Sequence, residues 1–448
     1  MPPRHIAILG GGLTAKTTGR LGLQHRTRPA SRRPRLCSPR RRPAHSPTVV
    51  KLRPRAGVLD PPPPGSPIRS SPPPKSSPAA KNRYLHVPGT PGIYKIPGPR
   101  LSYLWSELRF FIQPGINFEL VRGWNRPEGV LDESLESFLT RRGHAITARV
   151  LGSAIGHGIY AADARLLSVR AAFPKLWELE EKGKGRILWY LLTRGKKARE
   201  EEKQKADEEQ RQYQLGDVPK LMDGVSVYSF RDGMGTLADA LGRAVAKNPN
   251  IRMLPGTEVT GLRFDDEHGF EISTDRTNPL LPSHIVSALP LPALAKLIPD
   301  SHPLPYLTTN PASSVTAINL VFPGTKIFPR GFGDTLAPGE GITKVTVMMG
   351  GPHRLREGDT ALPVVLAHLQ YHLNRRAPLP TPLVTRTWQH KECIPTPLPG
   401  HLERMKKLKE ALDGQGWEGR MEVVGAGVRG VSLGDCVESG RGVGSRWA

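Results

Sequence analysis

The stretch that decides the fold is HIAILGGGLTA, His5 to Ala15. Four apolar residues, Ile6 to Leu9, run into three glycines, and Gly10 to Ala15 satisfy the pattern G-x-G-x-x-G/A. In this pattern the first glycine permits a tight turn, the second lets the backbone approach a pyrophosphate, and the last small residue allows a helix to pack closely on the strand. The N-terminus of such a helix supplies N–H donors for the anion. The stretch therefore predicts a buried strand followed by a dinucleotide-binding turn.

The sequence after Ala15 does not continue this unit. Arginine, proline and serine dominate from Lys16 to about Pro78, as in PRLCSPRRRPAHSP and PPPPGSPIRSSPPPKSSP. Proline at this density removes backbone donors and blocks regular helix and sheet. The helix of the unit and the acidic residue expected about 20 residues further on are both missing. We therefore expect a disordered Arg/Pro-rich segment over residues 16–78.

The charge of the chain is unevenly placed. The 448 residues carry a net charge of +24, which would ordinarily suggest a nucleic acid or an anionic membrane surface as partner. Fourteen lysines and arginines precede the first acidic residue, Asp60, so more than half of the excess lies in a segment without apolar periodicity. The charge therefore says little about the folded part.

Cysteine usage and hydropathy exclude several classes of protein. Cys37, Cys393 and Cys436 have neither metal-ligand nor disulfide-framework spacing, which favours reduced thiols in an intracellular protein. No uninterrupted apolar run reaches the length of a transmembrane helix. A secretory signal is not expected, because the first strand begins at Ile6.

The rest of the chain alternates between helical and strand patterns. Apolar residues recur at helical spacing from Leu131 to Leu192, and the mixed charges of residues 194–212 predict a solvated helix or an inserted loop. The strands predicted after this point are VSVYSF (225–230), TEVTGLRF (257–264), GFEIST (269–274), HIVSA (284–288), VTAINLVFPG (315–324), ITKVTVMMGG (342–351) and MEVV (421–424). Helices are predicted at 236–248, after the strand at 284–288, and from about Leu433. Because the expected sheet strands lie far apart in sequence, the pattern favours an α/β or α+β flavoenzyme-like architecture with interleaved domains.

Blocks of sequence spread along the chain resemble the protoporphyrinogen oxidase family. They are SPAAKNRYLHVPG, SFLTRRG, GHGIYAADARLLSVRAAFPKLWELE, VYSFRDGMGTLADAL, VTVMMGG, CIPTPLPGHLERM and GVSLGDCVESGR, from about Ser77 to Arg441, preceded by Ile6 to Ala15. The blocks GHGIYAADARLLS and MGTLADAL together separate this family from the related amine oxidases. The resemblance implies a flavoenzyme with a Rossmann-like FAD/NAD(P)-binding fold, in which FAD, substrate and helical membrane-associating domains are interleaved.

On this resemblance the chain divides into six segments. These are 1–15, the first strand and turn of the FAD-binding domain; 16–78, the disordered segment; 79–220, a mainly helical substrate and membrane-associating region; 221–300, the FAD-binding domain continued; 301–410, the strands of the substrate domain; and 411–448, the C-terminal FAD-binding segment.

The resemblance also implies site residues. Those matching the FAD site are Gly10, Gly11, Gly12, Leu13, Thr14 and Ala15 at the pyrophosphate, Val259 on the adenine side, and Val431, Ser432 and Leu433 in the stretch that closes over the flavin. Arg83 matches an arginine at the tetrapyrrole pocket, where a guanidinium can pair bidentately with a propionate. Gly158 matches a position whose backbone faces the macrocycle, where a side chain would intrude. Without the resemblance, the alternative for Arg83 is a surface arginine, and for Gly158 simple helix packing is the favoured interpretation.

The function implied by the resemblance is the oxygen-dependent, six-electron oxidation of protoporphyrinogen IX to protoporphyrin IX, the penultimate step of haem biosynthesis. FAD carries the electrons to molecular oxygen, hydrogen peroxide is formed, and the protein orients the macrocycle and excludes water. We nominate no catalytic residue and no metal, and we interpret His157 and His401 as structural. The implied location is peripheral, on the inner mitochondrial membrane, which suits a hydrophobic substrate. A homodimer is a possible assembly.

Residues 16–76 depart from the family, which has there a helix, a strand ending in Glu for the FAD ribose, and glycine-rich turns around the flavin. The sequence on both sides of this segment resembles the family, and the segment itself does not. A frameshift or a mispredicted splice junction would produce this pattern. A messenger RNA that encodes these residues in frame would contradict that hypothesis. An Arg-rich, acid-free stretch is also consistent with a mitochondrial transit peptide. Two alternatives to a working oxidase remain open: an FAD-deficient remnant that acts at most as a binding protein, and a nucleic-acid binder that uses the basic arm. We rank the nucleic-acid binder last, because the basic arm lacks interleaved aromatic residues.

Overall fold

The computed structural model describes residues 5–10, 82–96, 109–121, 126–143, 145–195, 200–201, 204, 207–208, 218–225, 235–265, 269–276, 278–324, 341–414 and 416–447. The segment 16–78, residues 11–15 of the glycine turn, and residues 226–230 of the strand predicted at 225–230 lie outside them. Within the charged stretch 194–212, residues 200–201, 204 and 207–208 are helical and exposed, as expected of a solvated helix.

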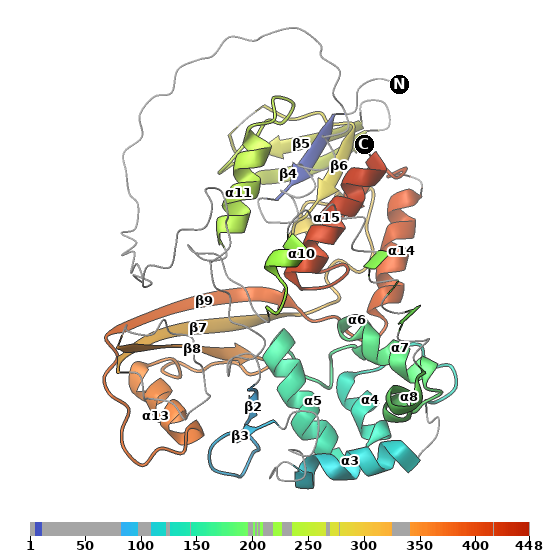
Figure 1. The fold of residues 1–448 in the computed structure, drawn as a ribbon. Coiled ribbons are helices and arrows are strands. Elements are labelled where there is room, and N and C mark those ends of the chain that lie inside the picture. The colour runs from blue at the N-terminus through green and yellow to red at the C-terminus, as the bar shows by residue number, and fades with distance from the viewer. Residues whose placement is uncertain are drawn as a thin grey trace.

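A parallel sheet of three strands from distant parts of the chain lies in the upper half of the molecule (Figure 1). Its order is β1 (Ile6–Leu9), β6 (His284–Ser287) and β10 (Met421–Val423). Both outer strands run parallel to β6 and share it as their hydrogen-bonding partner. β1 is wholly apolar, and β6 and β10 are apolar apart from His284, Ser287 and Glu422, which suits a parallel sheet covered on both faces. The predicted strands, and the prediction that they lie far apart in sequence, are confirmed.

Each face of this sheet is covered by apolar side chains. On one face Ile285 and Met421 belong to a core that also contains residues of α12 (Leu291–Ala295), of α14 (His401–Asp413), and of the antiparallel pair β4 (Val259–Asp265) and β5 (Gly269–Thr274). On the other face Val286 packs against Val443 of α15 (Leu433–Trp447). The helices α10 (Val218–Leu221) and α11 (Gly235–Ala246) belong to the same half of the molecule (Figure 1). The helices predicted at 236–248 and from Leu433 are therefore present.

A second, antiparallel sheet lies below the first (Figure 1). Its order is β8 (Ile342–Gly351), β7 (Ala312–Pro323) and β9 (Val384–Pro395). One face packs Ile318 and Leu320 against α13 (Leu362–His372). The opposite face leaves Met348 and Trp388, which both lie opposite Ala317 of β7, 72% and 59% exposed. The strands β7 and β8 confirm the strands predicted at 315–324 and 342–351.

The helical part of the chain confirms the spacing seen between Leu131 and Leu192. Its helices are α3 (Arg109–Val121), α4 (Leu135–Arg142), α5 (Ala145–Tyr160), α6 (Val169–Ala172), α7 (Pro174–Lys182) and α8 (Ile187–Thr193). They enclose a core that includes Phe138, Leu167 and Trp177. A short hairpin of β2 (Tyr84–Leu85) and β3 (Tyr94–Lys95) packs against α5. Among the residues described, no helix is long and apolar enough to cross a bilayer.

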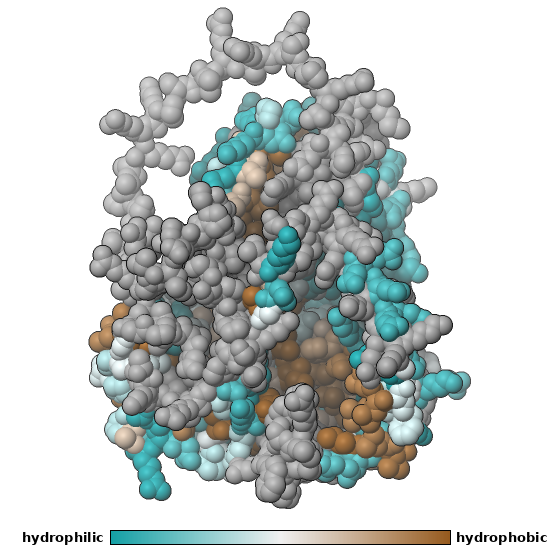
Figure 2. Space-filling view, in the orientation of Figure 1, coloured by the Kyte–Doolittle hydropathy of each residue, from teal (hydrophilic) through white to brown (hydrophobic). Residues whose placement is uncertain are grey.

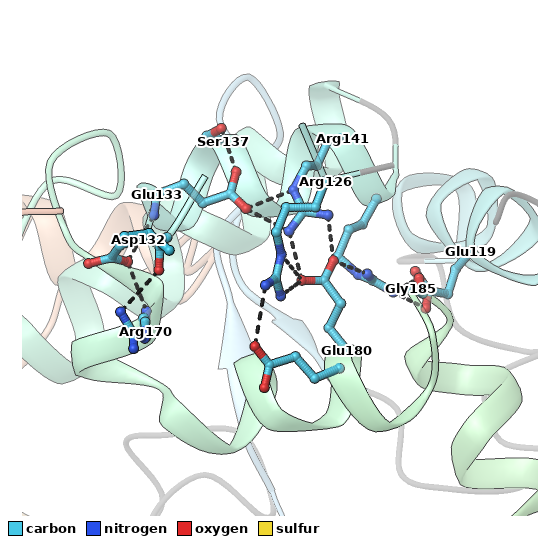
Figure 3. Close-up of polar contacts among 12 residues, drawn as sticks. Glu119, Arg126, Asp132, Glu133, Ser137, Arg141, Arg170, Glu180 and Gly185 are labelled. Carbon is cyan, nitrogen blue, oxygen red and sulfur yellow. Dashed lines mark hydrogen bonds and ion pairs between the residues drawn. The ribbon is translucent and has the colours of Figure 1, made fainter. Parts of the chain in front are cut away.

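A buried ionic network joins α3, α4 and α7 (Figure 3). At its centre the fully buried carboxylate of Glu180 accepts hydrogen bonds from Arg126, Arg141 and Arg142, the last at 2.6 Å. Burial by itself would raise the pKa of Glu180, but the arginine hydrogen bonds and charges outweigh it and hold that pKa below its ordinary value. The outer partners of the network are Glu119 and the Gly185 carbonyl for Arg142, Glu133 for Arg141, and Glu181 for Arg126.

Replacing Glu180 with Gln should destabilise the fold by about 3–5 kcal/mol, because it leaves buried guanidinium groups without their counter-charge. Glu181→Gln is the matched control: its carboxylate is 52% exposed and pairs with Arg126 at 3.3 Å, so its loss should cost less than about 1 kcal/mol. The measurement is denaturant unfolding. The pKa of Glu180 is lowered in the folded protein. The contribution of Glu180 to the free energy of unfolding is therefore complete above the ordinary carboxyl pKa, and it is lost as the pH falls through the pKa of the folded state. Equal destabilisation by the two variants would contradict this account.

Candidate functional site

The three parallel strands end at one edge of their sheet, and two of them run directly into glycine turns. Gly10 follows β1 with φ +117°, and Gly425 follows β10 with φ +113°. A Cβ atom on Gly10 would lie 3.3 Å from the carbonyl oxygen of Ala288, which follows β6 and whose N–H donates to the Leu9 carbonyl. Neither the backbone conformation nor the space at Gly10 suits a side chain. Open parallel sheets bind ligands outside this carboxyl edge.

The edge fits a dinucleotide. Gly10 is the first glycine of the predicted turn and has the conformation that the turn requires; residues 11–15 lie outside the described residues. At the end of β6 the Ser287 hydroxyl is fully buried and has no hydrogen-bond partner among the residues described. A buried hydroxyl without a partner costs free energy, so a polar ligand group at this edge would find a donor available.

A pocket lies where the C-terminal segment, the helical part and the second sheet meet. Its lining residues are Tyr160, Ala171, Asn310, Pro395, Pro397, His401, Ala426, Gly427, Arg429, Gly430 and Val431. Val431, one of the residues matched to the flavin-closing stretch, also packs against the core of the helical part. The pocket is therefore formed jointly by segments that are far apart in sequence.

The residues after Val431 begin α15 with a reciprocal cap. The Ser432 hydroxyl accepts from the Asp435 N–H at 3.1 Å, and the Asp435 carboxylate accepts from the Ser432 N–H at 3.0 Å. Leu433 is the first residue of this helix and is 40% exposed. Val259 lies elsewhere: it begins β4, opposite Thr274, and packs against the core below the parallel sheet.

Arg83 precedes a hairpin that packs on α5, the helix that carries Gly158. Arg83 is exposed and precedes β2, where its guanidinium donates to the Asn82 carbonyl at 2.9 Å. Two residues on, Leu85 packs against a group of α5 side chains that includes Ala154. Gly158 is one helical turn after Ala154, on the same side of the helix. It is exposed, and no atom lies within 4 Å of the position that its Cβ would take.

The two histidines interpreted as structural differ in their surroundings. His401 is 2% exposed, and both of its ring nitrogens are hydrogen-bonded, Nδ1 to the Asn310 amide at 2.9 Å and Nε2 to the Val428 carbonyl at 3.0 Å. His157 is half-buried, with its ring 5.7 Å from that of His353. Burial, helped by His353, lowers the pKa of His157. The part of the chain that the structure describes holds no group of three or more metal-ligating side chains.

The polar lining of the pocket escaped the sequence analysis. Asn310 and Arg429 belong to no quoted block, and Tyr160 lies in the block GHGIYAADARLLS without being singled out; the chain brings the three together from three regions. The available signal was positional: His401 lies in CIPTPLPGHLERM, and Gly430 and Val431 in GVSLGDCVESGR, two of the blocks that carry the resemblance.

Comparison with known proteins gives consistent matches. Residues 125–442 match the family described as "Flavin containing amine oxidoreductase". The protoporphyrinogen oxidase of Bos taurus is 28% identical over 406 residues, which cover 82% of this chain and 79% of that protein. The protoporphyrinogen oxidase of Homo sapiens is 27% identical over 401 residues, covering 81% and 78%, and that of Schizosaccharomyces pombe is 28% identical over 402 residues, covering 82% and 78%.

Solved structures share the fold. A crystal structure from Exiguobacterium sp. 255-15, named as a candidate protoporphyrinogen oxidase, aligns with a TM-score of 0.60 and 17% identity over 79% of this chain and 78% of that one. A triple mutant of putrescine oxidase aligns with a TM-score of 0.53 and 12% identity over 99% and 98%. These matches confirm the predicted flavoenzyme fold class, with its mixture of helices and sheets.

Proposed function

Because the chain belongs to the flavin-containing amine oxidoreductase family and is an FAD-dependent oxidoreductase by fold, we propose that its reaction is the oxygen-dependent oxidation of protoporphyrinogen IX to protoporphyrin IX. One observation carries the proposal: protoporphyrinogen oxidases resemble this chain along about four fifths of its length. The family match over residues 125–442 includes the segments that line the pocket. The penultimate step of haem biosynthesis is the place in metabolism that this reaction implies.

We assign the cofactor to the edge of the parallel sheet. The turn from Gly10 to Ala15 would hold the pyrophosphate, Val259 the adenine side, and Val431 to Leu433 the flavin end. The positive φ of Gly10 supports this assignment. When bound, FAD accepts hydride equivalents from the substrate and passes electrons to oxygen. The protein's own part is to orient the macrocycle and keep water from it.

We assign the substrate to the region of α5. Figure 2 shows a hollowed hydrophobic surface in the middle of the molecule, at the level where Figure 1 draws α5. Ile159, next to Gly158, is 59% exposed, and a planar apolar macrocycle would cover such a surface. Arg83 would pair with a propionate carboxylate, and the absence of a side chain at Gly158 would let the ring approach the helix backbone.

We further propose that the helical part attaches peripherally to a membrane, which the resemblance to protoporphyrinogen oxidases makes the inner mitochondrial membrane. Trp189 and Leu192 of α8 are 50% and 71% exposed, and Val121 at the end of α3 is 82% exposed. Figure 2 shows hydrophobic surface at the lower right, where Figure 1 places α8 and α3. Exposed apolar side chains of this kind can enter the interface of a bilayer without a spanning helix. A homodimer would be compatible with this arrangement.

Membrane attachment predicts that the double variant Trp189→Ser, Leu192→Ser loses affinity for vesicles containing an anionic phospholipid by about tenfold or more, because two large apolar side chains no longer enter the bilayer. Co-sedimentation measures the partition. Leu281→Ser is the control, since Leu281 is 67% exposed but follows β5 in the other half of the molecule. Equal partition of both variants and the original protein into the vesicles would contradict the proposal.

The reaction itself is tested on the purified chain supplied with FAD. Protoporphyrinogen IX should lose six hydrogens and become fluorescent protoporphyrin IX, while one molecule of hydrogen peroxide forms for every two electrons transferred to oxygen. A preparation that binds FAD but oxidises no porphyrinogen would show that the substrate is wrong. A colourless preparation that takes up no flavin would favour the FAD-deficient remnant, and salt-sensitive retention on DNA by such a preparation would favour the nucleic-acid binder.

Arg83→Ala should raise KM for protoporphyrinogen about 10- to 100-fold and leave kcat nearly unchanged, because a charged hydrogen bond to a propionate is made equally in the ground and transition states. The KM of Arg83→Lys should lie between those of the original protein and of Arg83→Ala, since an ammonium keeps the charge but cannot form the bidentate pair. Lys95→Ala removes a positive charge from β3 of the same hairpin and serves as the control. A rise in KM of similar size for Lys95→Ala would show that only the net charge of the hairpin matters.

A further inference from the structure

The loop from Gly425 to Val431 joins β10 to α15 and forms one wall of the pocket. Within the loop the Val428 N–H donates to the Gly425 carbonyl at 3.1 Å, which closes a turn. The Gly425 N–H lies 3.4 Å from the hydroxyl of Ser439 on α15. A third hydrogen bond comes from a different element: His401, at the start of α14, donates from Nε2 to the Val428 carbonyl.

The orientation of the Asn310 amide fixes the other side of the His401 ring. Asn310 Oδ1 accepts from the Leu398 N–H at 3.2 Å and from the Arg404 guanidinium at 3.4 Å. Its Nδ2 therefore faces His401 Nδ1 and must donate to it. Turning the amide over would place an N–H₂ group against two donors. The ring is thus held in one tautomer, with Nδ1 as acceptor and Nε2–H as donor.

The same contacts require a neutral imidazole. A proton on Nδ1 would face the Asn310 N–H₂ group, so protonation breaks that hydrogen bond. Burial lowers the pKa of His401; the Val428 hydrogen bond opposes this, the Arg404 charge adds to it, and Asp132 and Glu403 oppose it. The other titratable groups that line the pocket beside it are Arg429 and Tyr160.

We propose that His401 is a positioning residue: its neutral ring joins Asn310 to the Val428 carbonyl and so fixes the loop that leads into Val431, Ser432 and Leu433. Acidification that protonates the ring keeps the Nε2–H donor to Val428 but sets an Nδ1–H against the Asn310 N–H₂ group, so the ring and the loop bonded to it lose their anchor on Asn310. With both nitrogens engaged by protein atoms, the ring has no free lone pair with which to act as a base. The inference rests on the proposed cofactor assignment for its consequence, but it concerns the loop and is independent of the porphyrinogen substrate.

The test is hydrogen–deuterium exchange at the backbone amides of residues 424–433, on the full chain as purified and with its flavin content measured. His401→Phe removes both hydrogen bonds and should speed exchange in this segment about tenfold relative to the intrinsic rate. His401→Gln offers a donor to Val428 and an acceptor to Asn310 without a titrating group, so it should restore slow exchange. His368→Gln is the control, because His368 is exposed on α13, in the other sheet's layer.

The dependence on pH separates positioning from mere packing. In the original protein the segment should lose protection as the pH falls below the ordinary histidine pKa of about 6.5, because the folded ring resists protonation. In His401→Gln that acid-induced loss should vanish while in His368→Gln it persists. The proposal is overturned if the acid-induced loss of exchange protection persists in His401→Gln. This comparison does not depend on whether His401→Phe folds. Because the readout is exchange, failure here is distinct from failure to oxidise protoporphyrinogen.

Discussion

The parallel pairing of β6 with β1 and β10 is the constraint on which the rest of the structure depends. The strands are short, at four, four and three residues, and each outer strand is separated from β6 by more than a hundred residues. A ladder of this kind closes long loops for few hydrogen bonds, so apolar burial on both faces must stabilise it. Ile285 and Val286, both fully buried, supply that burial in opposite directions. The pairing also brings the turns at Gly10 and Gly425 to one edge, where the cofactor assignment needs them.

A second set of contacts attaches the helical part to this sheet. Asp132, before α4, accepts hydrogen bonds from the Ser168 hydroxyl at 2.7 Å and from the N–H of Gly400 at 2.8 Å. Gly400 immediately precedes α14, and α14 packs beneath the parallel sheet. Arg170 and Glu403 form an ion pair across the same junction. The pocket, with His401 as the first residue of α14, therefore lies where the two halves are joined, and its geometry depends on both.

Much of the fold was predictable because local pattern and burial agree. The strands at β1, β6, β7, β8 and β10 are apolar or alternating, and α11 has an apolar stripe in which Leu241 and Val245 are buried. β9 was missed because almost all of its residues are exposed and polar, so VTRTWQHKECIP shows no alternation. The site was predictable only in part. Gly10 has a motif whose backbone requirement can be read from the sequence, whereas the contact of His401 with Asn310 and Val428 spans 91 and 27 residues and leaves no local pattern.

The central claim is that the carboxyl edge of β1, β6 and β10 holds FAD, and the flavin content of a Gly10 variant tests it most directly. The original chain, refilled with FAD and freed of excess, should retain it in stoichiometric amount. Gly10→Ala should fold, as judged by circular dichroism, but retain little flavin, because φ +117° and a 3.3 Å approach to the Ala288 carbonyl force the turn to move. Gly195→Ala, at a position with open space after α8, should retain FAD fully. Full retention by Gly10→Ala, or none by the original chain, would contradict the account.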